Sequence, residues 1–339
     1  MAVVGGLADY GWGILCGVDM IRLSVILVAH NSAGYARAAL ESVRALCARL
    51  DARPGAGAWE VWVVDNASTD ETVDIIACEF PEVKVLRNLT NEGFGRANNW
   101  ALAVCRGAVV LLLNFDASYV TGDFTEIEAF FAAQTDCGVI GPKVVYPDGE
   151  IQPSNNAYPD LLTEVLRLLG VARLVRGAGL RQALARLPLG RTVNAYLRVY
   201  REVDQPRVVD WAAASALFIR RAVLDAGVRF DPAFQMYFED TDLCRQVRAA
   251  GYAVWYHPAL TFSHVADRAV ARMQADRFEN VNWQVGRMVY YRKHHSWWQR
   301  VVLRAMVLKM AALKWLTTFD AARRSRLAAV WRAGWHEAL

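Results

Sequence analysis

An acidic segment between Phe230 and Arg245 has the composition of a site for proton transfer. It places Glu239, Asp240 and Asp242 within four residues at the start of an expected helix. Acids favour helix N-termini, so capping explains part of this cluster. Aromatic residues flank it at Phe234, Tyr237 and Phe238. The partial desolvation that they would cause keeps a carboxylate basic enough to take a proton, so catalysis is favoured over capping.

A further carboxylate, Asp116, has the position of a metal ligand. It follows the apolar run 109–113, with Asn114 two residues before it. Hard divalent cations prefer oxygen ligands, and one carboxylate beside a diphosphate can hold Mg²⁺ or Mn²⁺ without a full protein cage. A single aspartate is a weak signal by itself. Its place at a strand end, after a nucleotide-type loop, strengthens the hypothesis.

Two polar loops contain residues suited to a nucleotide. Asp65 ends an expected strand, where a carboxylate can accept hydrogen bonds from a base or a ribose, whereas helix capping explains Ser68 and Asp70. The loop 91–99 superficially resembles a dinucleotide fingerprint, but Asn98 replaces the third glycine and the loop follows the third strand. This mismatch disfavours a dehydrogenase. The glycines would let the backbone approach a nucleotide, and a tight turn into a helix stays an open alternative.

Alternating strands and helices would position these residues. Runs of β-branched apolar residues followed by amphipathic patterns predict the individual elements. The expected strands are 23–29, 61–64, 83–86 and 109–113, and the expected helices follow them up to residue 50, at 69–78 and at 94–104. Such alternation predicts an α/β fold on a largely parallel sheet, whose ligands bind beyond the carboxyl ends of the strands.

The alternation weakens after residue 142. Residues 160–201 are rich in leucine and arginine and predict a basic amphipathic helical insertion. The pattern resumes with a strand at 216–219, a helix at 239–250 and a strand at 253–256, and the chain is expected to be helical from 278 onward. We therefore expect an N-terminal extension at 1–20, a main domain at 21–277 and a C-terminal helical region at 278–339.

The C-terminal region has an amphipathic character. Residues 301–316 are apolar but include Arg304, Lys309 and Lys314, which would be costly at the centre of a bilayer. We expect this segment to lie on the inner surface of the cell membrane, with basic side chains facing anionic lipid. Packing between subunits of a homo-oligomer is the alternative.

The overall composition excludes some classes of function. A formal charge of +4 and a pI near 8.7 are only mildly basic and disfavour a dedicated nucleic-acid binder. The six cysteines form no CxxC pair and are expected to be buried, reduced thiols of a cytoplasmic protein. Residues 1–19 lack a basic start and a cleavage pattern, so a signal peptide is not expected.

In this order the motifs resemble those of family 2 glycosyltransferases of the GT-A fold, particularly the rhamnosyltransferase-like members, over roughly residues 21–296. The resemblance implies that a nucleotide-sugar donor is bound by His30, Asn31, Asp65, Asn91, Gly93, Phe94, Asn98 and Asn114. It implies a metal site, for Mg²⁺ or Mn²⁺, at Asp116 and at His264, which follows the late strand. The acidic-pair motif of the family falls on Glu239 and Asp240, with Asp240 as the catalytic base.

The resemblance also implies an inverting transfer to a cell-surface polysaccharide or a lipid-linked acceptor. Glu239 would orient a hydroxyl group, and Arg268 or Arg272 would help to neutralise the leaving group. Some positions depart from the family: Phe115 replaces a proline, Ala214-Ser215 replaces the frequent Gly-Ala, and residues 265–268 replace a Gly/Ser-rich turn. The donor sugar is therefore less defined than the reaction, and dTDP-rhamnose is the first candidate.

Two other functions are compatible with parts of the sequence. A sugar-nucleotide-forming nucleotidyltransferase would share the fold, but residues 28–32 lack the Gly-rich basic loop that grips a triphosphate. A non-catalytic membrane-associated scaffold would use the arginine-rich segment and the C-terminal helices. The intact acidic segment disfavours the scaffold.

Overall fold

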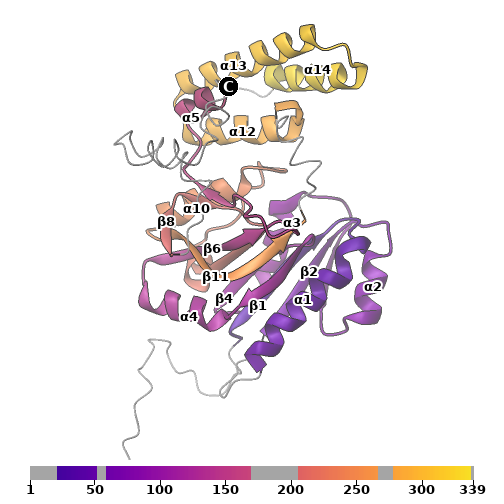
Figure 1. The fold of residues 1–339 in the computed structure, drawn as a ribbon, viewed down its shortest axis with the longest axis vertical. Helices are drawn as coiled ribbons and strands as arrows, with labels where there is room; N and C mark the ends of the chain where they lie inside the picture. Colours follow the sequence, from indigo (N-terminus) through magenta and orange to yellow (C-terminus); the bar gives the residue numbers. More distant parts are fainter. Residues whose placement is uncertain (1–20, 52–58, 169–204, 266–277, 337–339) are drawn as a thin grey trace, which may run out of the picture.

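The computed structural model describes residues 21–51, 59–168, 205–265 and 278–336. A central sheet with helices on both faces forms the larger part, and three C-terminal helices lie beyond one end of it (Figure 1). The sheet has the strand order β3-β2-β1-β4-β10-β6-β11-β5, with β8 paired to β11. The predicted α/β class is confirmed.

One half of the sheet is parallel. Its strands are β1 (Leu23–Ala29), β2 (Trp59–Asn66), β3 (Lys84–Asn88) and β4 (Val109–Asn114). The helices α1 (Ala33–Asp51), α2 (Thr72–Glu79) and α3 (Phe94–Val104) connect them. These elements agree with the expected ones to within a few residues, because each pairs a buried apolar strand with a clear amphipathic helix.

The other half of the sheet is mixed. Its strands are β5 (Ala117–Gly122), β6 (Cys137–Val145), β8 (Arg207–Val209), β10 (Ala216–Arg220) and β11 (Ala253–His264). Its helices are α4 (Phe124–Ala133), α9 (Arg221–Asp225) and α10 (Glu239–Ala249). β10 runs antiparallel to β4 and β6, whereas β11 is parallel to β6 and antiparallel to β5. A small ribbon joins β7 (Asn155–Asn156) to β9 (Trp211–Ala212).

Two hydrophobic clusters cover the two faces of the sheet. One cluster packs α1, α2 and α4 against one face, and the other packs α3, α9 and α10 against the opposite face. The helix that begins with the acidic pair therefore packs on the same face as the helix that begins with Phe94. This shared face brings the acidic segment to the loops at the carboxyl ends of the parallel strands.

A third cluster belongs to the C-terminal helices α12 (Val281–His294), α13 (Trp297–Thr317) and α14 (Ala321–His336). It also takes in Phe234 and Phe238 from the acidic segment. The short helix α5 (Leu161–Leu168) lies beside α12 (Figure 1). Within the ranges that the structure describes, no helix has the length and apolarity needed to cross a bilayer.

Some of the expected features could not be compared with the structure. The extension at 1–20 and most of the predicted insertion, residues 169–204, lie outside the described ranges, and α5 is the described part of that insertion. The sequence pattern missed β5, β6 and α4, because β6 contains the Gly141-Pro142 pair that read as a break. The division into domains stays a prediction.

A glycine at the entrance to α3 generates a stability prediction. Gly93 has φ +83°, and a Cβ atom there would lie 2.5 Å from the carbonyl oxygen of Gln235. Gly149 has φ +85° but open space around it. Left-handed backbone costs an alanine about 1–2 kcal/mol. Gly149→Ala should lose about that much unfolding free energy in urea, and Gly93→Ala distinctly more, because the acidic segment must also move. Equal losses would show that the close approach is unimportant.

Candidate active site

The ends of the parallel strands bring the first predicted residues together. Ala29 pairs with Asp65 across β1 and β2, and Val28 pairs with Asn114 across β1 and β4. His30 follows β1 directly, and its Nδ1 lies 2.9 Å from the carbonyl oxygen of Asn66, the last residue of β2. The predicted edge of the sheet therefore exists and is lined by polar groups.

Local hydrogen bonds shape the loops after β1 and β2. Asn31 has φ +50°, and its side-chain oxygen accepts from the backbone amide of Thr69 at 2.8 Å. The carboxylate of Asp65 is almost fully buried, accepts from the amide of Ser68 at 3.0 Å and lies 3.6 Å from Arg87. Both residues thus stabilise the loops as well as facing the edge where a nucleotide would bind.

Asn66 connects these loops to the one before α3, and the sequence analysis did not single it out. Its side-chain nitrogen donates to Asn91 at 2.8 Å, and its oxygen accepts from Asn88 at 3.0 Å and from the amide of Glu92 at 3.1 Å. The side chain is buried. Its place directly after Asp65 was the available signal, but its partners lie more than 20 residues away.

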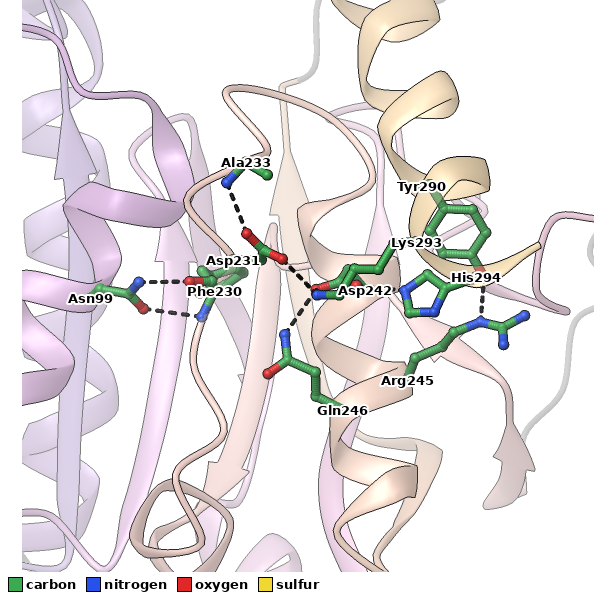
Figure 2. Close-up of polar contacts among 10 residues, drawn as sticks. All are labelled: Asn99, Phe230, Asp231, Ala233, Asp242, Arg245, Gln246, Tyr290, Lys293 and His294. Carbon is green, nitrogen blue, oxygen red and sulfur yellow. Dashed lines mark hydrogen bonds and ion pairs between the residues drawn. The ribbon is translucent and has the colours of Figure 1, made fainter. Parts of the chain in front are cut away.

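The loop before α3 packs against the acidic segment. Phe94 makes an edge-to-face contact with Phe230 at 5.9 Å between ring centroids. Asn99 exchanges two hydrogen bonds with the backbone of Phe230, at 2.8 and 3.1 Å (Figure 2). Asn98, by contrast, is buried, and its side chain donates to the carbonyl of Phe94 within α3. This side chain therefore stabilises the start of the helix.

The predicted metal ligands Asp116 and His264 lie side by side. β11 pairs with β5 so that His264 lies opposite Ala117, and the amide of Val265 donates to the carbonyl of Asp116. His264 Nε2 is 3.2 Å from Asp116 Oδ1 and 3.3 Å from the side-chain nitrogen of Asn114. Three predicted residues, separated by up to 150 positions, therefore meet at the ends of β4 and β11.

The tautomer of His264 fits a metal ligand. Its Nδ1 lies 2.8 Å from the side-chain oxygen of Gln152, which can only accept, so Nδ1 carries the proton. A metal ion would need the lone pair of Nε2, which in this structure faces the Asp116 carboxylate and the side-chain nitrogen of Asn114. Within the described ranges, no group of three or more His, Cys, Asp or Glu side chains is arranged to hold a metal ion by itself. This two-ligand site suits a cation whose remaining ligands come from substrate phosphates.

The acidic pair lies at the N-terminus of α10, after a strained turn. Tyr237 and Phe238 both adopt left-handed backbone, with φ of +68° and +69°. Non-glycine residues rarely do so, at a cost of about 1–2 kcal/mol each. Glu239 is buried, and its Oε2 has no hydrogen-bond partner among the described residues. A buried carboxyl without a partner is expected to keep its proton.

The two carboxylates differ in their surroundings. Burial, and then the negative charge of Asp240, raise the pKa of Glu239. Burial also raises the pKa of Asp240, although hydrogen bonds from Thr241 and from the backbone of Ala214 oppose this change. Asp240 is therefore the member of the pair that ionises, with a pKa above that of an ordinary aspartate, as a general base requires.

The dipeptide Ala214-Ser215 forms hydrogen bonds both with the predicted base, Asp240, and with Asn114 at the end of β4. The backbone amide of Asn114 donates to the carbonyl of Ser215 at 3.0 Å, while the backbone of Ala214 hydrogen-bonds to Asp240. The segment 214–215 precedes β10, which is inserted between β4 and β6. The predicted base Asp240 and the end of β4, which carries Asn114, thus contact the same short piece of backbone.

Comparison with known proteins identifies the class of this site. Residues 24–172, which hold the loops at the parallel edge and Asp116, match the family model described as glycosyl transferase family 2. This chain is a glycosyltransferase, and these residues are similar to family 2. The predicted enzyme class is confirmed, and the nucleotidyltransferase and scaffold hypotheses are not favoured.

Two curated proteins are similar to this glycosyltransferase over most of its length. N-acetylglucosaminyl-diphospho-decaprenol L-rhamnosyltransferase of Mycobacterium tuberculosis is 26% identical over 279 residues, which are 78% of this chain and 85% of that protein. Uncharacterized protein y4gI of Sinorhizobium fredii is 30% identical over 248 residues, which are 71% of this chain and 24% of that protein.

Solved structures of glycosyltransferases resemble it distantly. S. aureus TarS 1–349 has a TM-score of 0.47 and 17% identity, over 92% of this chain and 71% of TarS. The mannosyltransferase PcManGT from Pyrobaculum calidifontis, solved with GDP-Man and Mn²⁺, has a TM-score of 0.47 and 15% identity, over 93% and 86% of the two chains. At such scores these likenesses add no argument about the site.

Asp242, the third acid, is not available as a base in this glycosyltransferase. Its fully buried carboxylate accepts from Gln246 at 2.8 Å, Lys293 at 2.9 Å and His294 at 2.6 Å (Figure 2). Burial alone would raise the pKa of Asp242, but these hydrogen bonds outweigh it and lower the pKa. The three acids at the start of α10 therefore divide into the pair Glu239 and Asp240, whose pKa values are raised, and Asp242, whose pKa is lowered by its hydrogen-bond partners.

Opposite pKa shifts predict opposite effects on stability. Because the pKa of Asp240 is raised by folding, its ionised form opposes folding at a pH above both its folded and unfolded pKa values. Because the pKa of Asp242 is lowered by folding, its ionised form favours folding at such a pH. At about pH 8, Asp240→Asn should raise the melting temperature, whereas Asp242→Asn should lower the unfolding free energy by about 3–5 kcal/mol. The gain in Asp240→Asn should disappear as acid protonates Asp240, whereas the loss in Asp242→Asn should persist to lower pH, because the lowered pKa keeps Asp242 ionised there. Loss of stability in Asp240→Asn would contradict this assignment.

Proposed function

We propose that this glycosyltransferase moves a sugar, rhamnose from dTDP-rhamnose in the first instance, to a lipid-linked acceptor with inversion at the anomeric carbon. The observation that carries the proposal is the dipeptide 214–215, which places Asp240 next to the strand end that bears Asn114 and Asp116. An acceptor hydroxyl near Asp240 and a donor diphosphate near Asp116 would then meet beside this dipeptide.

The proposed chemistry follows from the state of the acidic pair. Asp240 takes the proton of the acceptor hydroxyl, whose oxygen forms the new bond to the anomeric carbon as the bond to the nucleoside diphosphate breaks. Glu239, which keeps its proton, donates a hydrogen bond to a sugar hydroxyl and orients it. A divalent cation, Mg²⁺ or Mn²⁺, held by Asp116 and His264 would stabilise the negative charge of the leaving diphosphate.

The proposed donor site is the polar edge of the parallel half. His30, Asn31, Asp65 and the loop from Asn91 to Phe94 line it, and Asn114 closes it toward the metal ligands. Asn98 supports this loop from inside α3. Arg268 and Arg272, which we expected near the leaving group, lie outside the described residues.

The proposed donor and acceptor rest on the curated relative. Its name describes transfer of L-rhamnose to N-acetylglucosaminyl-diphospho-decaprenol, and 85% of its length aligns with this chain. A lipid-linked acceptor would bring the enzyme to a membrane, on its cytoplasmic face.

A donor screen with two variants tests this mechanism. Wild-type protein should release nucleoside diphosphate from one of a panel of nucleotide sugars, detected by mass spectrometry, with dTDP-rhamnose tried first. Asp240→Asn should keep donor affinity and lose transfer by about 100- to 10,000-fold, because only proton transfer is removed. Asp116→Ala should instead lose the part of donor affinity that EDTA removes from the wild type. Normal turnover of Asp240→Asn, or EDTA-independent donor binding, would contradict the respective assignment.

The surface of α13 and α14 supports the proposed membrane contact. Large apolar side chains are exposed there at Trp297, Trp298, Val301, Val302, Leu313, Trp315, Leu316, Phe319, Trp331 and Trp335. Phe319, between the two helices, is 93% exposed. So many exposed apolar side chains on two helices suit an interaction site, and tryptophan favours the interface of a bilayer.

The charges of α13 and α14 favour contact with an anionic bilayer over a neutral one. Basic residues occupy positions 300, 304, 309, 314, 323, 324, 326 and 332, and between residues 297 and 336 the acidic residue is Asp320. Each such cation contributes about 1 kcal/mol near an anionic leaflet. A bilayer that contains anionic lipid therefore fits this face better than a neutral one, and better than a second copy of the same basic face.

Vesicle flotation tests the membrane contact. The protein should float with phosphatidylglycerol-containing vesicles at low salt, less so in high salt, and not with phosphatidylcholine alone. The double variant Trp315→Ser, Phe319→Ser should lose most of this binding, whereas Trp100→Ser, which removes an equally exposed tryptophan from α3, should keep it. Flotation that is unchanged in the double variant, or a stable dimer that masks these helices, would contradict the proposal.

A further inference from the structure

The acidic segment is held by contacts from outside the α/β part of the molecule. Its strained residues, Tyr237 and Phe238, precede the acidic pair directly. Unusual backbone of this kind persists only where surrounding groups determine it. The groups that surround it come from α12, which is part of the C-terminal helical layer.

Close packing with α12 fixes the strained backbone. A Cβ atom on Gly286 would lie 2.5 Å from the carbonyl oxygen of Tyr237, so the helix and the turn are in direct backbone contact. Phe238 packs on Trp283 and Tyr290, with ring centroids 4.8 and 5.7 Å apart. The turn therefore cannot relax without moving α12.

Charged groups near the end of α12 hold the segment at two points. The ammonium group of Lys293 lies 2.6 Å from Asp231 and 2.9 Å from Asp242, and so connects the start of the acidic segment to the first turn of α10 (Figure 2). His294 Nε2 lies 2.6 Å from the other oxygen of Asp242. The residues between these two anchor points include both strained residues and the acidic pair.

We infer that Lys293 and His294 are positioning residues for the proposed catalytic base, acting through Asp242 and Asp231 to hold Asp240 against the dipeptide 214–215 at the end of β4. This inference rests on the proposed role of Asp240. It assigns a part of the catalytic apparatus to a helix that follows the whole α/β fold. Neither residue reaches the reacting atoms; each fixes the carboxylate that lies two positions after the base.

The chain offers a matched control on the same helix. Arg287 forms a buried ion pair with Glu164 of α5, at 2.7 Å, and also contacts Gln284. This pair stabilises the packing of α12 but touches neither Asp231 nor Asp242. Lys293→Met and Arg287→Met should both lower the melting temperature, whereas a positioning role predicts that they differ in their effect on catalysis.

Kinetics and hydrogen exchange of the full-length protein test the inference. Lys293→Met should lower kcat by about 10- to 100-fold, as expected when a reacting group is misplaced, and leave the KM for the donor within about twofold. Amide exchange in residues 232–242 should become faster by a similar factor. Arg287→Met should change neither quantity, and Lys293→Arg should recover part of kcat because it keeps the charge.

A double variant separates positioning from an uncompensated buried charge. Lys293→Met with Asp242→Asn leaves no buried carboxylate at position 242 without its cation, so part of the melting temperature should recover. The kcat should stay low because Asp231 and α10 are no longer connected. Recovery of kcat in the double variant, unchanged exchange in Lys293→Met, or an equal loss of kcat in Arg287→Met would overturn the inference. If the wild type turns over no nucleotide sugar, the proposed function fails, and hydrogen exchange still decides whether Lys293 holds the segment.

Discussion

The structure depends on how three carboxylates share the first turn of one helix. Glu239, Asp240 and Asp242 would repel one another if all were ionised and equally buried. Lys293 and His294 contact Asp242, which is fully buried, and the ammonium group of Lys293 offsets its charge. Among the described residues no cation pairs with the other two carboxylates, and their pKa values are raised. The same helix N-terminus thus provides a structural anion and a base, because one acid has a charged partner and the others do not.

The parallel half of the sheet gathers the binding groups, and the mixed half brings the base to them. Antiparallel β10 lies between β4 and β6, so the dipeptide before it runs along the end of β4. The carbonyl oxygen of Ser215 accepts from the amide of Asn114, and the backbone of Ala214 hydrogen-bonds to the Asp240 carboxylate. β11 then returns beside β5 and places His264 against Asp116. Each half alone would leave the site without either its base or its nucleotide edge.

Much of this arrangement could be predicted from local sequence patterns. The bounds of β1, α3 and α10 follow from apolar periodicity. The proximity of Asp116 and His264 was expected from the family resemblance, not from a local pattern. The roles of Asn66, Gln152 and Lys293 could not be predicted, since each depends on partners distant in sequence. An isolated polar residue has no periodicity that reveals such a partner. Asp242 was ambiguous for the same reason, because its neutralising groups lie 51 and 52 residues away.

The aromatic residues beside the acids pack against the C-terminal helices, which therefore help to hold the acidic segment in place. Phe234 and Phe238 read as a rim that would desolvate the acidic pair, yet both are buried in the cluster built by α12 and α13. Full burial of such side chains contributes about 1.5–3 kcal/mol each. That free energy is gained only when α12 covers the segment, and it opposes the strain at Tyr237 and Phe238. The helices α13 and α14 pack on α12 and carry the exposed tryptophans. Only α12 therefore separates a contact made at that surface from the segment that contains Asp240.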